Sequence, residues 1–133
     1  MENKDTLLGN LRPGLNKLFD DMTENQACIQ NAVHCHLICK QLIQYSIQTG
    51  GIYAEPSHLR LLEDCSEICE TTANLILRES DLMKELCLVC MRACERCAAR
   101  CRRFPDNQRM TACAEACEQT ANSCSAVAAA AFN

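Results

Sequence analysis

Cysteines occupy the apolar positions that repeat with helical period along this chain. Cys87, Cys90, Cys94, Cys97 and Cys101 follow one another at steps of three, four, three and four, so they fall within about an 80° arc of one helix. Three shorter runs in the same rhythm hold the other cysteines, namely Cys28, Cys35, Cys39, Cys65, Cys69, Cys113, Cys117 and Cys124. Each run forms one stripe, and none of the 13 thiols is left on an expected outer face.

The stripes lie on four expected helices that are separated by helix-breaking residues. Gly50-Gly51 is a C-terminal stop signal, and residues 104–107 (FPDN) break the chain again. Ser57 and Ser80 are the expected N-caps of the second and third helices. The helices are expected at about residues 24–48, 57–79, 80–103 and from 108 into the alanine-rich tail. Short connections make long neighbouring helices antiparallel, so the pattern predicts an all-α, up-down-up-down four-helix bundle with a cysteine-lined core over residues 24–133.

Composition narrows the classes of function. A chain of 133 residues builds one domain with one core. Aromatic residues make up 4% of it, the net charge is -4 and the pI is near 5.3, which argues against nucleic acid as a partner. No apolar run approaches the ~18 residues of a membrane span, and no export signal is recognisable. We therefore expect no membrane partner and a cytoplasmic location in which the thiols stay reduced.

Several ordinary explanations of cysteine-rich helices are weaker here. As core residues, 13 cysteines would each sacrifice roughly 1 kcal/mol or more relative to Leu. A disulfide scaffold is disfavoured by the odd number of cysteines and by the regular helices. Structural zinc and iron–sulfur sites usually draw their ligands from turns and loop runs. A zinc-binding structural bundle, an iron–sulfur or thiol-redox protein, and a purely structural interaction protein remain as alternatives.

Cu(I) fits the stripes better than these alternatives. It is a soft ion that prefers thiolates and thioethers, and residues four apart on one helix are ~6 Å apart, close enough to share an ion. Neutral thiols let the bundle fold empty, because burying thirteen thiolates without counterions would be prohibitive. Each Cu(I) that enters and releases one proton leaves the core neutral, which predicts a capacity on the order of ten Cu(I) ions per chain.

The cysteine motifs also resemble those of a known family. Residues 27–124 look like the cytosolic branch of the copper storage proteins, which are cysteine-lined four-helix bundles. The resemblance is most specific at residues 64–69 (DCSEIC), 83–90 (MKELCLVC), 93–97 (ACERC) and 112–117 (ACAEAC). It implies a bundle that stores many Cu(I) ions in thiolate clusters, with all 13 cysteines as metal ligands, no catalytic residue and no organic cofactor.

Some positions in phase with the stripes are not cysteine, although cysteine-richer relatives often carry Cys there. Ala32, Leu42, Ser46 and Thr120 are inert examples of such positions. His58 and Met110 are different, because imidazole and thioether bind Cu(I); we expect them to be ligands where copper enters one end of the bundle. The alternatives are a gap-filling Met110 and a solvent-facing His58 in the first turn of its helix.

Residues 1–23 are a cysteine-free extension interrupted by Gly9 and Pro13. The segment at residues 6–13 resembles the short cargo-loading peptides that dock proteins inside encapsulin shells. The resemblance assigns docking to a short run of residues, Leu7, Leu8, Gly9, Asn10, Leu11 and Arg12. Leu15, Leu18 and Phe19 share a helical face with Leu11, so the alternative is a short amphipathic helix that covers the bundle.

These patterns together predict a copper store rather than an enzyme. The sequence shows no nucleophile with its base, no spaced acidic dyad and no phosphate-binding loop. The expected partners are copper ions and, through the extension, an encapsulin shell that would place the protein in its interior. Self-association into a homo-oligomer is left open.

Overall fold

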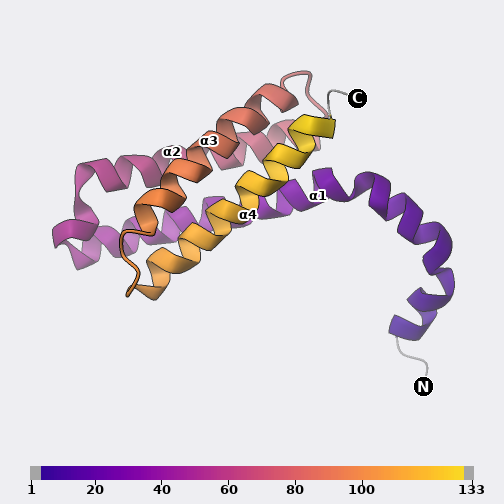
Figure 1. Cartoon of the computed structure of the whole chain (residues 1–133), viewed down its shortest axis with the longest axis horizontal. Helices are drawn as coiled ribbons and strands as arrows, with labels where there is room; N and C mark the ends of the chain where they lie inside the picture. Colours follow the sequence, from indigo (N-terminus) through magenta and orange to yellow (C-terminus); the bar gives the residue numbers. More distant parts are fainter. Residues whose placement is uncertain (1–3, 131–133) are drawn as a thin grey trace.

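The computed structural model is an antiparallel four-helix bundle (Figure 1). It describes the backbone of residues 4–130 and the side chains of residues 24–130. Within that range there is no strand, and no helix is long and apolar enough to cross a membrane. Each helix packs against its neighbours in the chain, and the last closes against the first. The all-α architecture is thus as the sequence predicted, with elements α1 (Lys4–Thr49), η1 (Gly51–Ala54, a 3₁₀ turn), α2 (Pro56–Leu77), α3 (Met83–Cys101) and α4 (Gln108–Ala130).

The first helix begins much earlier than its expected start near residue 24. Its backbone is helical from Lys4 and continues through Gly9 and Pro13. Proline removes one intrahelical hydrogen bond and bends a helix, but it need not end it. In Figure 1 these first turns curve away past the end of the bundle. The side chains of residues 4–23, which include the expected docking residues 7–12, lie outside the described set.

Glycine and asparagine set two of the helix ends as predicted. Gly50 and Gly51 adopt positive φ angles of 75° and 60°, and the Gly50 N–H donates to the Ser46 carbonyl at 2.9 Å, which ends α1. At the start of α4, the Asn107 Oδ1 accepts hydrogen bonds from the N–H groups of Arg109 (3.0 Å) and Met110 (3.1 Å). Asn107 therefore caps the helix inside the FPDN segment that breaks the chain.

The two serine caps expected from the sequence are wrong. Helix α2 begins at Pro56, with Glu55 as its N-cap residue and no side-chain cap. Proline suits the first helical position because its missing N–H would have no partner there, and this places Ser57 inside the helix. Helix α3 begins at Met83 rather than at residue 80. The Ser80 Oγ accepts from the Leu82 N–H at 3.1 Å and so stabilises the turn before that helix.

Thiols and small side chains fill the interior. All 13 cysteines are 0% exposed, which confirms that every stripe faces inward. Alanine is the most frequent of the other buried residues, and the large fully buried side chains are few, among them Leu62, Met110 and Val127. Polar contacts tie α1 to its neighbours, with Asn31 donating to Ser123 of α4 at 2.7 Å. Because large apolar groups are scarce, each one carries an unusually large share of the hydrophobic stabilisation.

Leu62→Ala is therefore expected to lower the free energy of unfolding of the reduced, copper-free protein by about 2–5 kcal/mol, because the side chain is fully buried. Denaturant titration under reducing conditions measures the change. The control is Leu77→Ala on the same helix, where Leu is 64% exposed, and it should alter the free energy by about 0.5 kcal/mol or less. Equal effects of the two variants would contradict the packing described here.

Candidate metal centre

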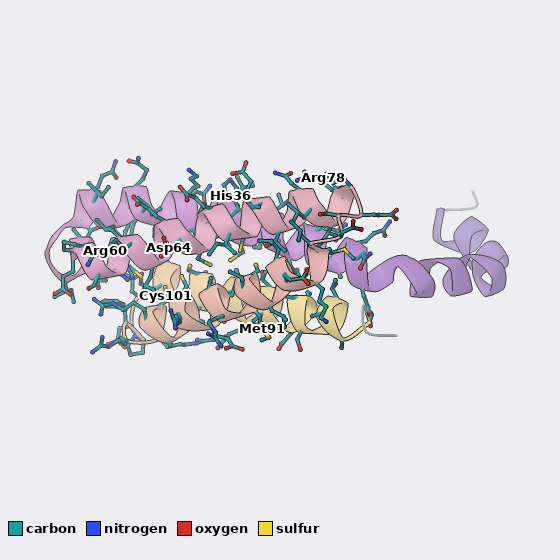
Figure 2. All side chains as sticks on the ribbon, turned by 90° about the horizontal axis from the view of Figure 1, so that it is seen from above. His36, Arg60, Asp64, Arg78, Met91 and Cys101 are labelled. Carbon is teal, nitrogen blue, oxygen red and sulfur yellow. The ribbon has the colours of Figure 1, made fainter. Side chains whose placement is uncertain are left out.

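The inward-facing stripes form one column of sulfur atoms along the bundle. Figure 2 shows sulfur along the inner sides of the helices, with outer faces of mostly polar side chains. All 13 cysteines are free thiols. Sulfur atoms on different helices lie 3.6–3.9 Å apart: Cys35 Sγ is 3.6 Å from Cys117 Sγ and 3.9 Å from Cys65 Sγ, and Cys69 Sγ is 3.7 Å from Cys94 Sγ. Antiparallel packing has brought together residues that are up to 96 positions apart in sequence.

Most of the thiols gather in groups that could hold a metal ion. In each group the sulfur atoms lie within 4.8 Å of one another. Three groups contain four cysteines: Cys35, Cys39, Cys65 and Cys117; Cys35, Cys65, Cys69 and Cys94; and Cys39, Cys97, Cys113 and Cys117.

The groups of four overlap. Cys35, Cys39, Cys65 and Cys117 each belong to two of them, so eight cysteines supply all three groups. An ion in one group would therefore share thiolates with an ion in the next. This arrangement requires bridging thiolates and differs from a set of separate mononuclear sites.

A group of three cysteines lies at the end of the column that is farthest from Cys101. It contains Cys28, Cys87 and Cys124, from α1, α3 and α4, and Cys28 Sγ is 3.6 Å from Cys124 Sγ. Helix α2 contributes no cysteine here, because its last cysteine is Cys69. Beyond it, the buried face of α2 consists of other residues, such as Thr72. The three helices therefore offer trigonal rather than tetrahedral coordination.

Two of the cysteines lie outside these groups but beside them. Cys90 Sγ is 3.8 Å from Cys69 Sγ, and so extends the column between the groups of three and four. The contacts of Cys101 are with Cys113 and Cys97, near the opposite end. All of the predicted cysteines thus belong to one continuous column.

Thiols at the two ends of the column are held in the neutral form. Hydrogen bonds with Cys28, Cys87 and Cys90, together with burial, raise the pKa of Cys124. Contacts with Cys113 and Cys97, together with burial, likewise raise the pKa of Cys101. A thiolate left alone in this interior would lack solvation, so these groups keep their protons near neutral pH and lose them only to an arriving cation.

Aromatic side chains close the end of the bundle at which Cys101 lies. The rings of Tyr53 and Phe104 have centroids 5.1 Å apart, and those of Tyr45 and Tyr53 are 6.3 Å apart. Asn107 donates a hydrogen bond from Nδ2 to the Tyr45 hydroxyl at 2.9 Å, and the Arg109 guanidinium lies 4.8 Å from the centre of the Tyr45 ring. We call Tyr45, Tyr53 and Phe104 the aromatic cap, and this end of the bundle the cap end.

His58 lies directly beneath the aromatic cap. Its ring packs edge-on against Phe104 with centroids 5.3 Å apart. The side chain is 0% exposed, so the alternative of a solvent-facing His58 is wrong. Neither ring nitrogen has a hydrogen-bond partner. Burial lowers the pKa of His58, and the positive charge of Arg100 lowers it further, so the imidazole is neutral and able to bind a metal.

Other in-phase residues also come to the cap end. Met110 is 0% exposed, one helical turn before Cys113 on α4. Ser46 is fully buried as well, and its Oγ has no hydrogen-bond partner. Buried polar atoms without partners are uncommon in folded proteins. Three such atoms, the Ser46 Oγ and both His58 nitrogens, lie at the cap end.

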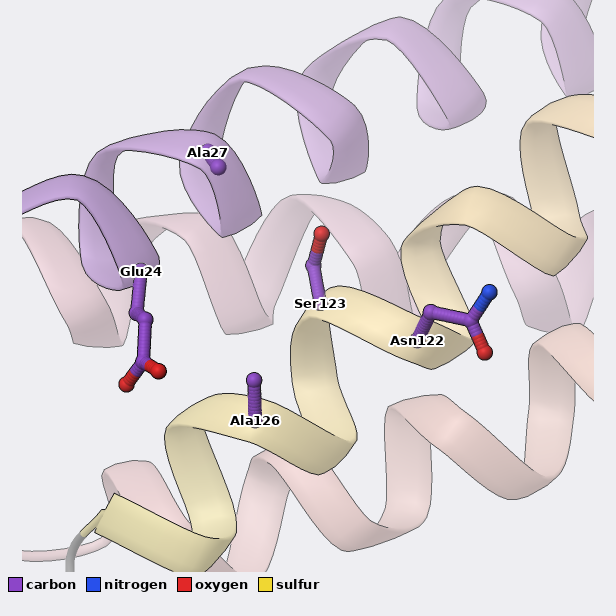
Figure 3. Close-up of a pocket in the computed structure, with 5 residues that line it drawn as sticks. All are labelled: Glu24, Ala27, Asn122, Ser123 and Ala126. Atoms are coloured by element: carbon purple, nitrogen blue, oxygen red, sulfur yellow. The ribbon is translucent and has the colours of Figure 1, made fainter.

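The sequence analysis did not identify the aromatic cap. Three of the five aromatic residues in the chain flank the two connections that an up-down bundle places at one end, and this signal was present in the sequence. The hollow of about 300 Å³ between α1 and α4, shown in Figure 3, is lined by Glu24, Ala27, Asn122, Ser123 and Ala126, and contains no thiol or imidazole.

His34 and His36 are not in the core. His34 is exposed, and His36 is partly buried on the outer side of the α1–α2 interface. The His36 Nδ1 lies 2.8 Å from the Ser66 carbonyl oxygen, to which it donates when protonated at that atom. This imidazole therefore links two helices and does not face the thiols.

Comparisons with known proteins agree with this geometry. A protein from Nitrosospira multiformis, Nmul_A1745, has a similar structure with a TM-score of 0.75 and 34% sequence identity, covering 81% of this chain and 97% of that one. A Cu(I)-bound copper storage protein, BsCsp3, matches with a TM-score of 0.74 and 28% identity over 79% of this chain and 98% of that one. YhjQ of Bacillus subtilis (strain 168), named as an uncharacterized cysteine-rich protein, is 29% identical over 105 residues, which are 79% of this chain and 96% of YhjQ.

The match to a protein family covers the whole bundle. Residues 21–129 match the family of copper storage proteins, and this range contains every cysteine of the column and all four bundle helices except the first turns of α1. With its inward-facing thiols and its structural likeness to a Cu(I)-bound relative, the chain belongs to the copper storage protein family.

Proposed function

We propose that this protein stores Cu(I) ions as thiolate clusters inside the bundle, with all 13 cysteines as ligands. The overlapping groups of four cysteines carry this proposal, because shared sulfur atoms suit an ion that accepts bridging thiolates. BsCsp3, a relative of the same fold, is a Cu(I)-bound copper storage protein. The role that follows is storage, buffering and detoxification, without turnover or a catalytic residue.

The charge balance of the column favours a monovalent ion. Each Cu(I) that replaces one thiol proton leaves the buried column with the charge it had before. Divalent zinc in one group of four thiolates would leave two uncompensated negative charges, and because each Zn²⁺ must replace two protons, neutrality limits the 13 thiols to about six zinc ions, half the number of monovalent ions. Zinc therefore fits one group by geometry but cannot fill the column.

Copper enters, in this proposal, at the cap end. His58 and Met110 offer a neutral imidazole and a thioether beside Cys113, next to the column. Such weaker ligands can take up an ion and pass it to thiolates without holding it as tightly. The unpartnered nitrogens of His58 support this assignment, because an ion would supply the partner that they lack.

The same proposal places the protein in the cytoplasm, as cargo of an encapsulin shell. The support is the resemblance of residues 6–13 to cargo-loading peptides. The helical path of α1 is compatible with docking, since its first turns extend past the end of the bundle (Figure 1).

An anaerobic Cu(I) titration of the reduced protein against a chromophoric chelator should saturate at about ten equivalents or more. The triple variant Cys35→Ser, Cys65→Ser, Cys117→Ser should bind about three fewer, because it removes sulfur atoms shared between groups. Ala99→Ser, Ala112→Ser, Ala129→Ser, three changes at exposed positions, is the matched control and should keep the full capacity. Saturation at one or two equivalents, or preferential filling by zinc, would refute storage.

Replacing the two ligands at the cap end should slow copper uptake but leave the capacity unchanged. The variant His58→Phe, Met110→Leu replaces both side chains by apolar groups of similar size that cannot bind copper. Its initial rate of Cu(I) uptake should fall roughly tenfold. Stopped-flow absorption of the thiolate-to-copper band measures the rate. His34→Phe, a change at an exposed histidine, should have no effect. Unchanged rates in the double variant would remove His58 and Met110 from the route.

Co-expression with an encapsulin shell protein tests the docking segment. The unmodified chain should elute with assembled shells in size-exclusion chromatography, whereas Leu7→Ser, Leu8→Ser, Leu11→Ser should elute as free protein. Leu15→Ser, Leu18→Ser changes apolar residues just beyond the segment and should still elute with shells. Free elution of the unmodified chain would show that the segment is not a loading peptide.

A further inference from the structure

The cap end is positively charged in an otherwise acidic protein. Residues 45–60 and 100–109, which form this end, carry five arginines and two acidic residues, a net charge of +3. The whole chain has a net charge of -4, so the remaining residues carry -7. Arg60 lies at this end of the bundle in Figure 2, whereas Arg78 lies at the opposite end. An anion that approaches the molecule is therefore drawn to the end where the column begins.

A hollow of about 220 Å³ lies within this positive end. It is lined by Ile52, Glu55, Arg100, Arg103 and Phe104. Glu55 is the acidic group in it, and it pairs with the Arg100 Nη2 at 2.9 Å. The Arg100 Nε is buried without a hydrogen-bond partner, and Arg103 pairs with no carboxylate among the described side chains. The three charged groups leave a net charge of +1 with donors to spare, which suits one carboxylate.

Phe104 separates the hollow from the cap end of the column. Phe104 lines the hollow on one side and packs on the buried His58 ring on the other, with centroids 5.3 Å apart. A copper ion held in the hollow would thus be one aromatic ring away from the first unpartnered imidazole.

We propose that the cap end binds a small anionic Cu(I) carrier, a Cu(I)–thiolate complex with a carboxylate that binds Arg100 and Arg103. This inference rests on the proposed storage of Cu(I) and adds the chemical class of the donor. Under reducing conditions Cu(I) is held by thiolates, and two of them give a complex with a charge of -1 before any carboxylate is counted. The volume of the hollow is below that of a drug-sized ligand site, so it fits a small carrier.

The transfer is a ligand exchange without oxidation or reduction. Two Cu–S bonds to the carrier break and two Cu–S bonds to protein cysteines form. The two protein thiols give up their protons to the two departing carrier thiolates, which leave as thiols. The charge of -1 moves with the copper in this first step. When a second Cu(I) binds the same two protein thiolates and its two carrier ligands leave as thiolates, the site becomes neutral.

Two carriers that differ only in the carboxylate provide the test. Cu(I) complexes of N-acetylcysteine and of N-acetylcysteine amide have the same thiol ligand, but the first bears a carboxylate and the second a neutral amide. Anaerobic stopped-flow mixing at low salt measures the initial rate at which each carrier loads the unmodified protein. We expect the carboxylate carrier to load faster, and its advantage to disappear at high salt as the charges are screened.

Two arginine variants localise the effect. Arg103→Glu and Arg78→Glu make the same charge change at exposed positions on opposite ends of the bundle. Arg103→Glu should slow loading from the carboxylate carrier roughly fivefold or more and slow the amide carrier less. Arg78→Glu should leave both rates close to those of the unmodified protein. Equal slowing by both variants, or equal effects on both carriers, would overturn the proposal.

The final copper content of the same samples separates this inference from storage itself. If the protein is not a copper store, the unmodified chain takes up only one or two equivalents from either carrier. If storage holds and docking does not, every sample reaches full capacity at rates that do not depend on the carboxylate or on Arg103.

Discussion

The structure depends on one constraint: a column of 13 buried sulfur atoms must stay close to electrically neutral. Protonated thiols meet it in the empty bundle, and the raised pKa values of Cys101 and Cys124 reflect the cost of meeting it in any other way. A monovalent ion that replaces a proton meets it equally well. Because neutral thiols need no counterion, the bundle can fold without metal.

This constraint also explains why the two ends differ. Around the group of three cysteines the remaining core is closed by uncharged side chains such as Thr72 and Val127. At the cap end a neutral imidazole, a thioether and an unpartnered hydroxyl lie beneath a layer of aromatic rings and arginines. Polar groups with unfilled hydrogen-bonding capacity occur where an ion would first lose its solvent or its carrier. The two ends of the column thus differ in the side chains that surround them.

Much of the fold could be predicted from the sequence because the cysteines repeat with helical period. Steps of three and four fix which face of a helix is buried, and they correctly placed every cysteine inside. Short connections fixed the antiparallel order, and Gly50-Gly51 fixed the end of α1. The starts of α2 and α3 were misplaced because a proline at the first helical position and a serine-stabilised turn replaced the expected caps. Propensity alone does not predict whether a helix continues through a residue such as Pro13.

The cap end could be predicted only in part. The phases of His58 and Met110 indicated the right face, but burial of the first turn of α2 depends on Phe104 and Tyr53, which come from two connections with no periodicity. Contacts between loops are set by the three-dimensional path of the chain, so spacing along one helix carries no information about them. The pairing of Asn107 with Tyr45 across 62 positions is of the same kind.

Sulfur atoms that belong to two groups at once have a consequence for the order in which ions are held. An ion can move from one group to the next by exchanging one sulfur at a time, so it is never without ligands along the way. If copper enters at the cap end, as proposed, the ions that arrive first would lie deepest, toward Cys28, Cys87 and Cys124, and would be the last to leave. The copper taken up most recently would then form a readily exchanged pool, and the deepest ions a reserve.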